Sequence, residues 1–128
     1  MVSLKLLFTI LSISYVFGIF LFADSPMVSD LARFNPYSLL HIPLYGVLSV
    51  LLIFSFLPFR FNPINPINHS FVPGGIALGV AIADEIHQSF IPGRNPSLND
   101  VLLDLFGIIL AFVLISRFHK HQPDSITQ

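Results

Sequence analysis

The fold of this chain is decided by the stretch Asp84–Arg94, which reads DEIHQSFIPGR. It places acid, imidazole and amide side chains and an arginine inside or beside segments that are otherwise apolar. A charged group at the centre of a membrane helix costs about 2.5–3.5 kcal/mol on insertion scales, so such groups require partners or water. We therefore expect the functional site in this stretch and in the two acids that follow it, Asp100 and Asp104.

The composition is that of a membrane protein. Of the 128 residues, 54% are hydrophobic and 10% are charged, and the mean hydropathy is +0.80. This length predicts one domain, residues 1–128. The absence of cysteine excludes disulfides and cysteine-ligated metals. A net charge of −1 without any basic run makes nucleic acid an unsuitable partner, so the lipid bilayer is the expected one.

Apolar segments predict an all-α membrane protein with four transmembrane helices, at about residues 5–23, 38–57, 73–90 and 99–118. The first is expected to be an anchor, because its apolar run is longer than that of a cleaved signal peptide. Residues 27–34 form a short amphiphilic piece suited to the membrane interface. The loop 59–72 holds closely spaced prolines and is predicted to be extended, so that the third helix begins near Pro73.

The basic residues predict the orientation of an antiparallel bundle. Alternating spans place Arg33 and Arg94 on one side, and on the other side they place Lys5, Arg60, Arg117 and Lys120. Because cytoplasmic loops carry the excess of Lys and Arg, both termini are expected to be cytoplasmic. The predicted protein is a multi-pass protein of the cell membrane, with residues 24–39, residues 91–99 and the polar site on the extracytoplasmic side.

Helical periodicity brings polar side chains onto shared faces. At about 100° per residue, an arc of about 160° on the third helix holds Asp84, Glu85, His87 and Gln88. Ile86 and Phe90 point the other way. A strip about 60° wide on the fourth helix holds Asp100, Asp104, Gly107 and Ala111, and the opposite side holds Leu102, Phe106, Ile109 and Val113. The small residues Gly75, Gly79 and Ala83 form a stripe that would let another helix approach closely.

A structural network is one interpretation of the polar residues. Arg94 would neutralise Asp84, Asp100 or Asp104, and hydrogen bonds between helices would involve His87, Gln88 and Tyr45. The acids outnumber Arg94, however, which is the only cation in their immediate sequence neighbourhood. Some of the acids must therefore be protonated, solvated or matched by a ligand.

Two chemical interpretations use the same residues. Metal binding has oxygen and nitrogen ligands in the acids and in His41 and His87, but their spacing matches no recognised metal signature, so no metal site is predicted. General acid–base chemistry would use a buried carboxyl group, His87 as base and Arg94 as phosphate binder. Neither the catalytic residues nor a cofactor can be assigned from these residues.

The motifs give a resemblance to a family. They are Asp84-Glu85-x-His87-Gln88, then Pro92-Gly93-Arg94, then Ser97-x-x-Asp100-Val101, with Gly107 after them and His41-x-x-x-Tyr45 before them. In these motifs the chain resembles the VanZ family of small bacterial membrane proteins, over about residues 38–111. It departs from the family pattern at Tyr37 and Ser38, where the family often has Asp-Lys, and at Asp104, where the family usually has Asn.

The resemblance implies a helical protein of the bacterial envelope, whose namesake is associated with low-level resistance to the glycopeptide teicoplanin. We expect an outward-facing pocket that binds an anionic lipid, a lipid-linked ligand or a cell-wall precursor. The alternatives are a membrane enzyme acting on a lipid-linked cell-wall precursor and a structural membrane partner without its own ligand. The expected binding residues are His41, Tyr45, Asp84, Glu85, His87, Gln88, Arg94, Asp100 and Asp104.

Overall fold

Helices make up nearly all of the described chain. The computed structural model describes residues 2–34, 38–56 and 66–120. Within these residues the helices are α1 (Val2–Phe22), α2 (Pro26–Phe34), α3 (His41–Phe56), α4 (Pro66–Gln88) and α5 (Leu98–Lys120). The predicted all-α class is confirmed, and the predicted amphiphilic piece at residues 27–34 is the helix α2.

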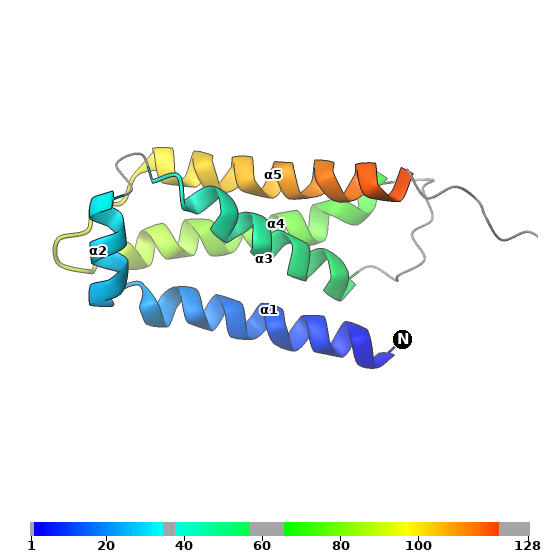
Figure 1. Cartoon of the computed structure of the whole chain (residues 1–128), viewed down its shortest axis with the longest axis horizontal. Helices are drawn as coiled ribbons and strands as arrows, with labels where there is room; N and C mark the ends of the chain where they lie inside the picture. The colour runs from blue at the N-terminus through cyan, green and yellow to red at the C-terminus, as the bar shows by residue number, and fades with distance from the viewer. Residues whose placement is uncertain (1, 35–37, 57–65, 121–128) are drawn as a thin grey trace, which may run out of the picture.

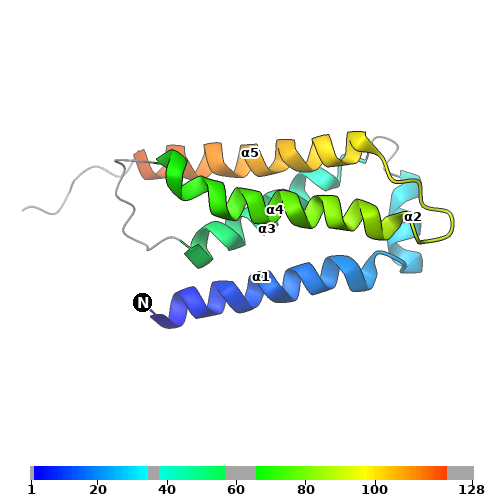
Figure 2. The ribbon, with the colours of Figure 1, turned by 180° about the vertical axis from the view of Figure 1, so that it is seen from behind.

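The four long helices lie side by side and reverse direction from each one to the next (Figure 1). α1 and α5 form opposite sides of the bundle, and α3 and α4 lie between them (Figure 2). The short helix α2 lies across one end of the bundle. This end therefore brings together the starts of α3 and α5, the end of α4 and the loop between α4 and α5.

The core is built around α3, which contacts α1, α4 and α5. Tyr45 and Leu48 of α3 are fully buried, and they pack against Ala77 and Ala81 of α4 and Ile108 of α5. The alanines add little side-chain bulk between α3 and α4. The two helices can therefore approach closely, as small residues allow in membrane helices.

A glycine sets the distance between α3 and α5. A Cβ atom added to Gly107 would overlap the backbone carbonyl of Ile42, and a Cβ atom at Gly46 would lie 3.5 Å from the carbonyl oxygen of Gly107. Backbone atoms cannot move aside as a flexible side chain can. Glycine is therefore required at residue 107 for this helix contact.

α1 is attached to α3 by a few polar contacts. The hydroxyl groups of Ser12 and Ser55 lie 3.1 Å apart, and Tyr15 donates a hydrogen bond of 3.0 Å to the carbonyl oxygen of Leu44. Only 6% of the apolar segment Ser3–Phe22 is buried inside the protein. Most of the apolar surface of α1 therefore remains to be covered from outside.

Among the residues that the structure describes, two helices are long and apolar enough to cross a membrane. The segments are Ser3–Phe22 in α1, with a mean hydropathy of 2.1, and Leu98–Phe118 in α5, with a mean hydropathy of 2.3. α3 is apolar but shorter, with 16 residues. Large apolar side chains such as Leu21, Phe106 and Ile109 are exposed on the outside of the bundle, which is the pattern of a surface that contacts lipid.

α4 begins earlier than predicted. The predicted start near Pro73 and the predicted extended loop up to residue 72 are wrong for residues 66–72, which are helical. Pro66 takes the first helical position, where its missing N–H costs nothing, and Pro73 is buried inside the helix. Proline is tolerated inside membrane helices because neighbouring groups can satisfy the carbonyl that it leaves free.

Three other predictions fall on residues outside the described ones. These are the end of the second helix and the start of the following loop, in residues 57–65, and the tail, in residues 121–128.

The predicted small-residue stripe of α4 does not pack inside this chain. Gly75, Gly79 and Ala83 are exposed, and a Cβ atom at either glycine would meet nothing within 4 Å. The inner face of α4 is instead the one that carries Ala77 and Ala81. This face is the one that continues into the polar residues at the end of the helix.

Candidate functional site

The polar residues of the sequence motifs gather at the end of the bundle that α2 crosses. The acid-bearing face of α4 points inward, with Asp84, Glu85 and Gln88 buried and Ile86 exposed. The predicted strip on α5 also points inward, because Asp104, Gly107 and Ala111 are buried whereas Leu102, Phe106, Ile109 and Val113 are exposed. The reversal of direction between α4 and α5 makes these two polar faces meet.

Asp84 is buried among hydrogen-bond donors. Its side chain is 3% exposed, and its Oδ2 accepts hydrogen bonds from the Tyr45 hydroxyl at 3.3 Å and from Nε2 of Gln88 at 3.1 Å. Its Oδ1 has no hydrogen-bond partner among the described residues. Asp84 therefore links α3 to α4 and keeps one oxygen unused.

His41 and Asp104 form a pair between the start of α3 and the first half of α5. Nδ1 of His41 lies 2.8 Å from Oδ1 of Asp104, whose residue is completely buried. Oδ2 of Asp104 is buried without a hydrogen-bond partner in the described part of the chain. Since Nδ1 of His41 is engaged by Asp104, Nε2 is the nitrogen that His41 has available for another partner.

Glu85 connects the end of α4 to the start of α5. Its Oε2 accepts a hydrogen bond of 2.8 Å from the backbone N–H of Ser97, and the hydroxyl of Ser97 accepts one from the N–H of Asn99. Ser97 therefore caps α5, because its side chain satisfies a backbone donor of the first turn. Oε1 of Glu85 is buried and has no hydrogen-bond partner in the residues that the structure covers.

Arg94 reaches across the loop to the end of α1. It donates a hydrogen bond of 3.0 Å to the carbonyl oxygen of Ala23, directly after the last residue of α1. In the described residues it forms no ion pair with Asp84, Asp100 or Asp104. The geometry thus supports a contact of Arg94 with a free carbonyl of the helix end, where a cation is favoured.

The side chain of His87 contacts α1 and lies apart from the other motif residues. Its ring lies edge-on against Phe20 of α1, with the ring centroids 5.4 Å apart. It does not line the cavity described below, and its buried Nδ1 has no hydrogen-bond partner among the residues described. The imidazole beside the cavity is that of His41, so the assignment of His87 as a base is not supported by this geometry.

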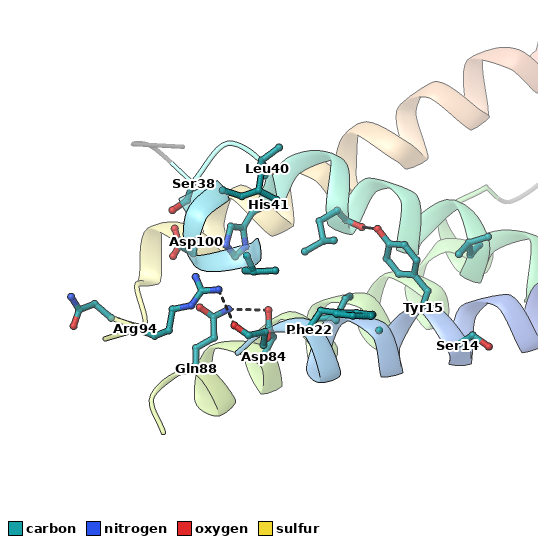
Figure 3. Close-up of a pocket in the computed structure, with 18 of the residues that line it drawn as sticks. Ser14, Tyr15, Phe22, Ser38, Leu40, His41, Asp84, Gln88, Arg94 and Asp100 are labelled. Carbon is teal, nitrogen blue, oxygen red and sulfur yellow. Dashed lines mark hydrogen bonds between the residues drawn. The ribbon is translucent and has the colours of Figure 1, made fainter. Parts of the chain in front are cut away.

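A cavity of about 810 Å³ runs from this polar end along α1 and α3. Figure 3 shows His41, Asp84, Gln88 and Arg94 gathered at one end of the cavity, and Tyr15 further along α1. The predicted residues that line it are His41, Asp84, Gln88, Arg94 and Asp100. Tyr45, Glu85 and Asp104 are not among the lining residues. Tyr45 contacts the lining residue Asp84, and Asp104 contacts the lining residue His41.

The apolar wall of the cavity was not predicted. α1 and α2 contribute Leu11, Ile19, Phe22, Val28 and Leu31. Leu40, directly before α3, and Leu44 and Leu51 of α3 complete this wall. In the sequence α1 reads as a membrane anchor alone. A sequence signal of this role is the adjacent polar pair Ser14 and Tyr15 in the middle of a mostly apolar helix, because both residues line the cavity.

Comparison with known proteins places the chain in a family. The model of the family described as VanZ/LLP1 matches residues 5–119. This range contains every predicted site residue, from His41 to Asp104, together with most of α1. No match was found among curated proteins or among solved structures. The matched range covers most of the chain, and the chain therefore belongs to the VanZ/LLP1 family.

Proposed function

We propose that this VanZ-like membrane protein binds an anionic lipid or lipid-linked envelope precursor in the cavity between α1 and α3. The observation that carries the proposal is the composition of the cavity wall, which is polar at one end and apolar along its length. A ligand with a charged headgroup and a hydrocarbon chain has the same two parts. Such an amphiphile would place its headgroup beside Arg94 and His41 and its chain along α1.

Arg94 and Gln88 supply hydrogen-bond donors for the headgroup. A guanidinium group has five N–H donors, and one nitrogen of Arg94 is engaged by the carbonyl of Ala23. The remaining donors can bind a phosphate or carboxylate with two parallel hydrogen bonds. Tyr15, Phe22 and Leu44 would contact the hydrocarbon chain, since all three line the cavity.

The proposed topology has α1, α3, α4 and α5 crossing the bilayer, with the cavity opening on the extracytoplasmic side. α3 is about 24 Å long at 1.5 Å per residue, which covers most of a hydrocarbon core of about 30 Å. The start of α1, which holds Lys5, and the end of α5, which holds Arg117, lie at one end of the bundle (Figure 1). The opposite end holds α2 with Arg33 and the loop between α4 and α5 with Arg94. Cytoplasmic placement of the first end follows the excess of Lys and Arg there.

The lipids that remain with the purified protein test this proposal. The full chain, purified in mild detergent, is extracted and its phosphate-containing lipids are quantified by mass spectrometry. We expect one lipid class to be enriched over the bulk extract, and Arg94→Ala to reduce this enrichment at least fivefold. Arg117→Ala is the matched control, because it removes an exposed arginine at the far end of α5. Equal enrichment in both variants and in the wild type would exclude Arg94 as the headgroup anchor.

Teicoplanin susceptibility provides the cellular measurement. We propose that a protein which occupies a lipid-linked precursor at the outer surface changes the access of a glycopeptide to that precursor. Expression of the chain in a susceptible bacterium should then raise the inhibitory concentration of teicoplanin. Arg94→Ala should abolish the increase, whereas Arg117→Ala should retain it.

A second candidate function is favoured by the pair His41–Asp104. An imidazole oriented by a buried carboxylate is the arrangement of a general base, and His41 lines the cavity. The alternative is therefore a membrane enzyme that acts on a lipid-linked cell-wall precursor. Incubation of the purified protein with such a precursor, followed by chromatography and mass spectrometry, would reveal a product that His41→Gln should fail to form. An unchanged precursor with the wild-type protein would exclude the enzyme.

A further inference from the structure

We propose that His41, Glu85 and Asp100 form a binding site for a divalent transition-metal cation such as Zn²⁺ or Mn²⁺. One potential ligand atom from each of these residues lies within 4.8 Å of the other two. The three residues come from three helices, α3, α4 and α5. This inference is independent of the lipid proposal, because it concerns the metal alone.

The donor atoms suit this class of cation. One imidazole nitrogen and two carboxylates favour Zn²⁺ or Mn²⁺ over softer metals, which prefer thiolates. In a tetrahedral site with metal–ligand bonds of about 2.1 Å, neighbouring ligand atoms lie about 3.4 Å apart. Atoms that already lie within 4.8 Å therefore reach this geometry by moving together by about 1.4 Å at most. Side-chain rotations can supply such a shift.

The contact between His41 and Asp104 prepares the imidazole for a metal. Histidine ligands usually donate their second ring N–H to a carboxylate or carbonyl, which fixes the tautomer and makes the ligating nitrogen more basic. Here Nδ1 of His41 lies 2.8 Å from Oδ1 of Asp104, so Nε2 is the available ligand. Asp104 is a positioning residue in this proposal. Its effect on the metal passes through His41.

The carboxylate of Glu85 is an independent indication of a missing cationic partner. Glu85 is 7% exposed, and its Oε2 is used by the N–H of Ser97, whereas its Oε1 is buried without a hydrogen-bond partner among the described residues. An ionised carboxylate in such surroundings is costly unless a cation lies beside it. Arg94 does not fill this role, because the hydrogen bond that it donates goes to Ala23.

A metal at this position would have access to the cavity. His41 and Asp100 are half-buried and line the cavity of about 810 Å³, whereas Glu85 lies behind them. Three protein ligands leave at least one coordination position for water or for an oxygen of a ligand in the cavity. The cation would also offset part of the negative charge of the surrounding acids.

Metal binding to the purified full chain tests the site. The affinity tag is removed, the protein in detergent is stripped with a chelator, and Zn²⁺ or Mn²⁺ is added alone. Bound metal is measured by elemental mass spectrometry after desalting, and the affinity by titration calorimetry. We expect about one metal ion per chain. Glu85→Gln, Asp100→Asn and His41→Gln should each weaken binding at least tenfold.

Two further variants separate a metal site from general electrostatics. Asp104→Asn should weaken binding about 10- to 100-fold while leaving the protein folded, as expected for a positioning residue. Asp30→Asn, which removes an exposed acid of α2, should leave metal affinity unchanged. Asp100→Asn is the decisive variant, since Asp100 lies at the edge of the site and its loss should not prevent folding. A folded Asp100→Asn protein with wild-type metal affinity, or a wild-type protein that binds no metal, would overturn the inference.

Discussion

His41 and Asp104 are separated by much of the sequence, yet Nδ1 of the first lies 2.8 Å from Oδ1 of the second. His41 is the first residue of α3, and Asp104 lies in the second turn of α5 at a fully buried position. The same two helices approach closely where Gly107, about one turn after Asp104, faces Ile42, the residue after His41. The pair therefore lies beside a position where the backbones of α3 and α5 approach each other closely.

Asp104→Ala should destabilise the protein by about 3 kcal/mol, because it leaves His41 without its partner beside a buried gap. Asp104→Asn should change the stability by about 1 kcal/mol or less, since the amide oxygen can still accept a hydrogen bond from Nδ1 of His41. Unfolding in detergent, followed by circular dichroism against temperature or denaturant, compares the two. Equal losses for both variants would mean that the charge of Asp104, rather than its hydrogen bond, stabilises the pair.

Gly107→Ala should destabilise the bundle by about 3 kcal/mol or more, because the added methyl group overlaps the backbone of Ile42 and forces α3 and α5 apart. Gly75→Ala is the matched control in another helix, since its Cβ atom meets nothing within 4 Å. It should leave stability unchanged or raise it by up to about 1 kcal/mol. The yield of monodisperse protein and its melting temperature measure both. A Gly107→Ala protein as stable as Gly75→Ala would contradict the close contact of the helices.

Periodicity was sufficient to predict which faces of α4 and α5 point inward. The burial of Asp84, Glu85, Gln88 and Asp104 follows from spacing alone, because a helix has a fixed rotation per residue. The same method gave the wrong role to the small-residue stripe with Gly75. Small residues permit a close approach, but the helix is rotated so that Ala77 and Ala81 take that place. Asp84 and Gln88 follow on the same face of α4 as these alanines, and their burial requires the same rotation of the helix about its axis.

The cavity and the grouping of the three proposed metal ligands could not be predicted from the sequence, for a different reason. His41, Glu85 and Asp100 match no metal signature because they come from three helices, and their proximity exists only after those helices pack. The apolar wall from α1 likewise depends on where α1 docks against α3. The predicted start of α4 near Pro73 is wrong because membrane helices tolerate proline in their interior, so Pro73 does not mark a helix boundary.

The proposed topology predicts a labelling pattern for single cysteines. The chain has no cysteine of its own, so a cysteine in place of Asn95 or Asn65 gives a clean signal. Asn95→Cys, in the loop between α4 and α5, should react with an impermeant thiol reagent in intact cells. Asn65→Cys should react only after the membrane is permeabilised. The reverse pattern would place the polar end of the bundle in the cytoplasm.

Substitution of Arg94 tests most directly whether this residue neutralises the charge of the neighbouring acids. If Arg94 neutralised Asp84 or Asp100, Arg94→Ala would strand a charge, and removing that acid as well would restore stability. The structure instead has Arg94 donating to the carbonyl of Ala23. We therefore expect Arg94→Ala to cost about 1–2 kcal/mol through the loss of that hydrogen bond. Neither Asp84→Asn nor Asp100→Asn should rescue it, so the double variants should show additive losses.

Arg94→Lys separates the contact with α1 from the contact with a ligand. A lysine can still donate one hydrogen bond to the carbonyl of Ala23, so the melting temperature should stay close to that of the wild type. It lacks the planar fork that binds a phosphate with two parallel hydrogen bonds, so the enriched lipid should be lost as in Arg94→Ala. Melting temperatures and lipid content are measured on the same preparations. Retention of the lipid in Arg94→Lys would show that a single positive charge is sufficient for lipid binding. If Asp84→Asn or Asp100→Asn restored the stability of Arg94→Ala, Arg94 would instead be an internal ion-pair partner of that acid.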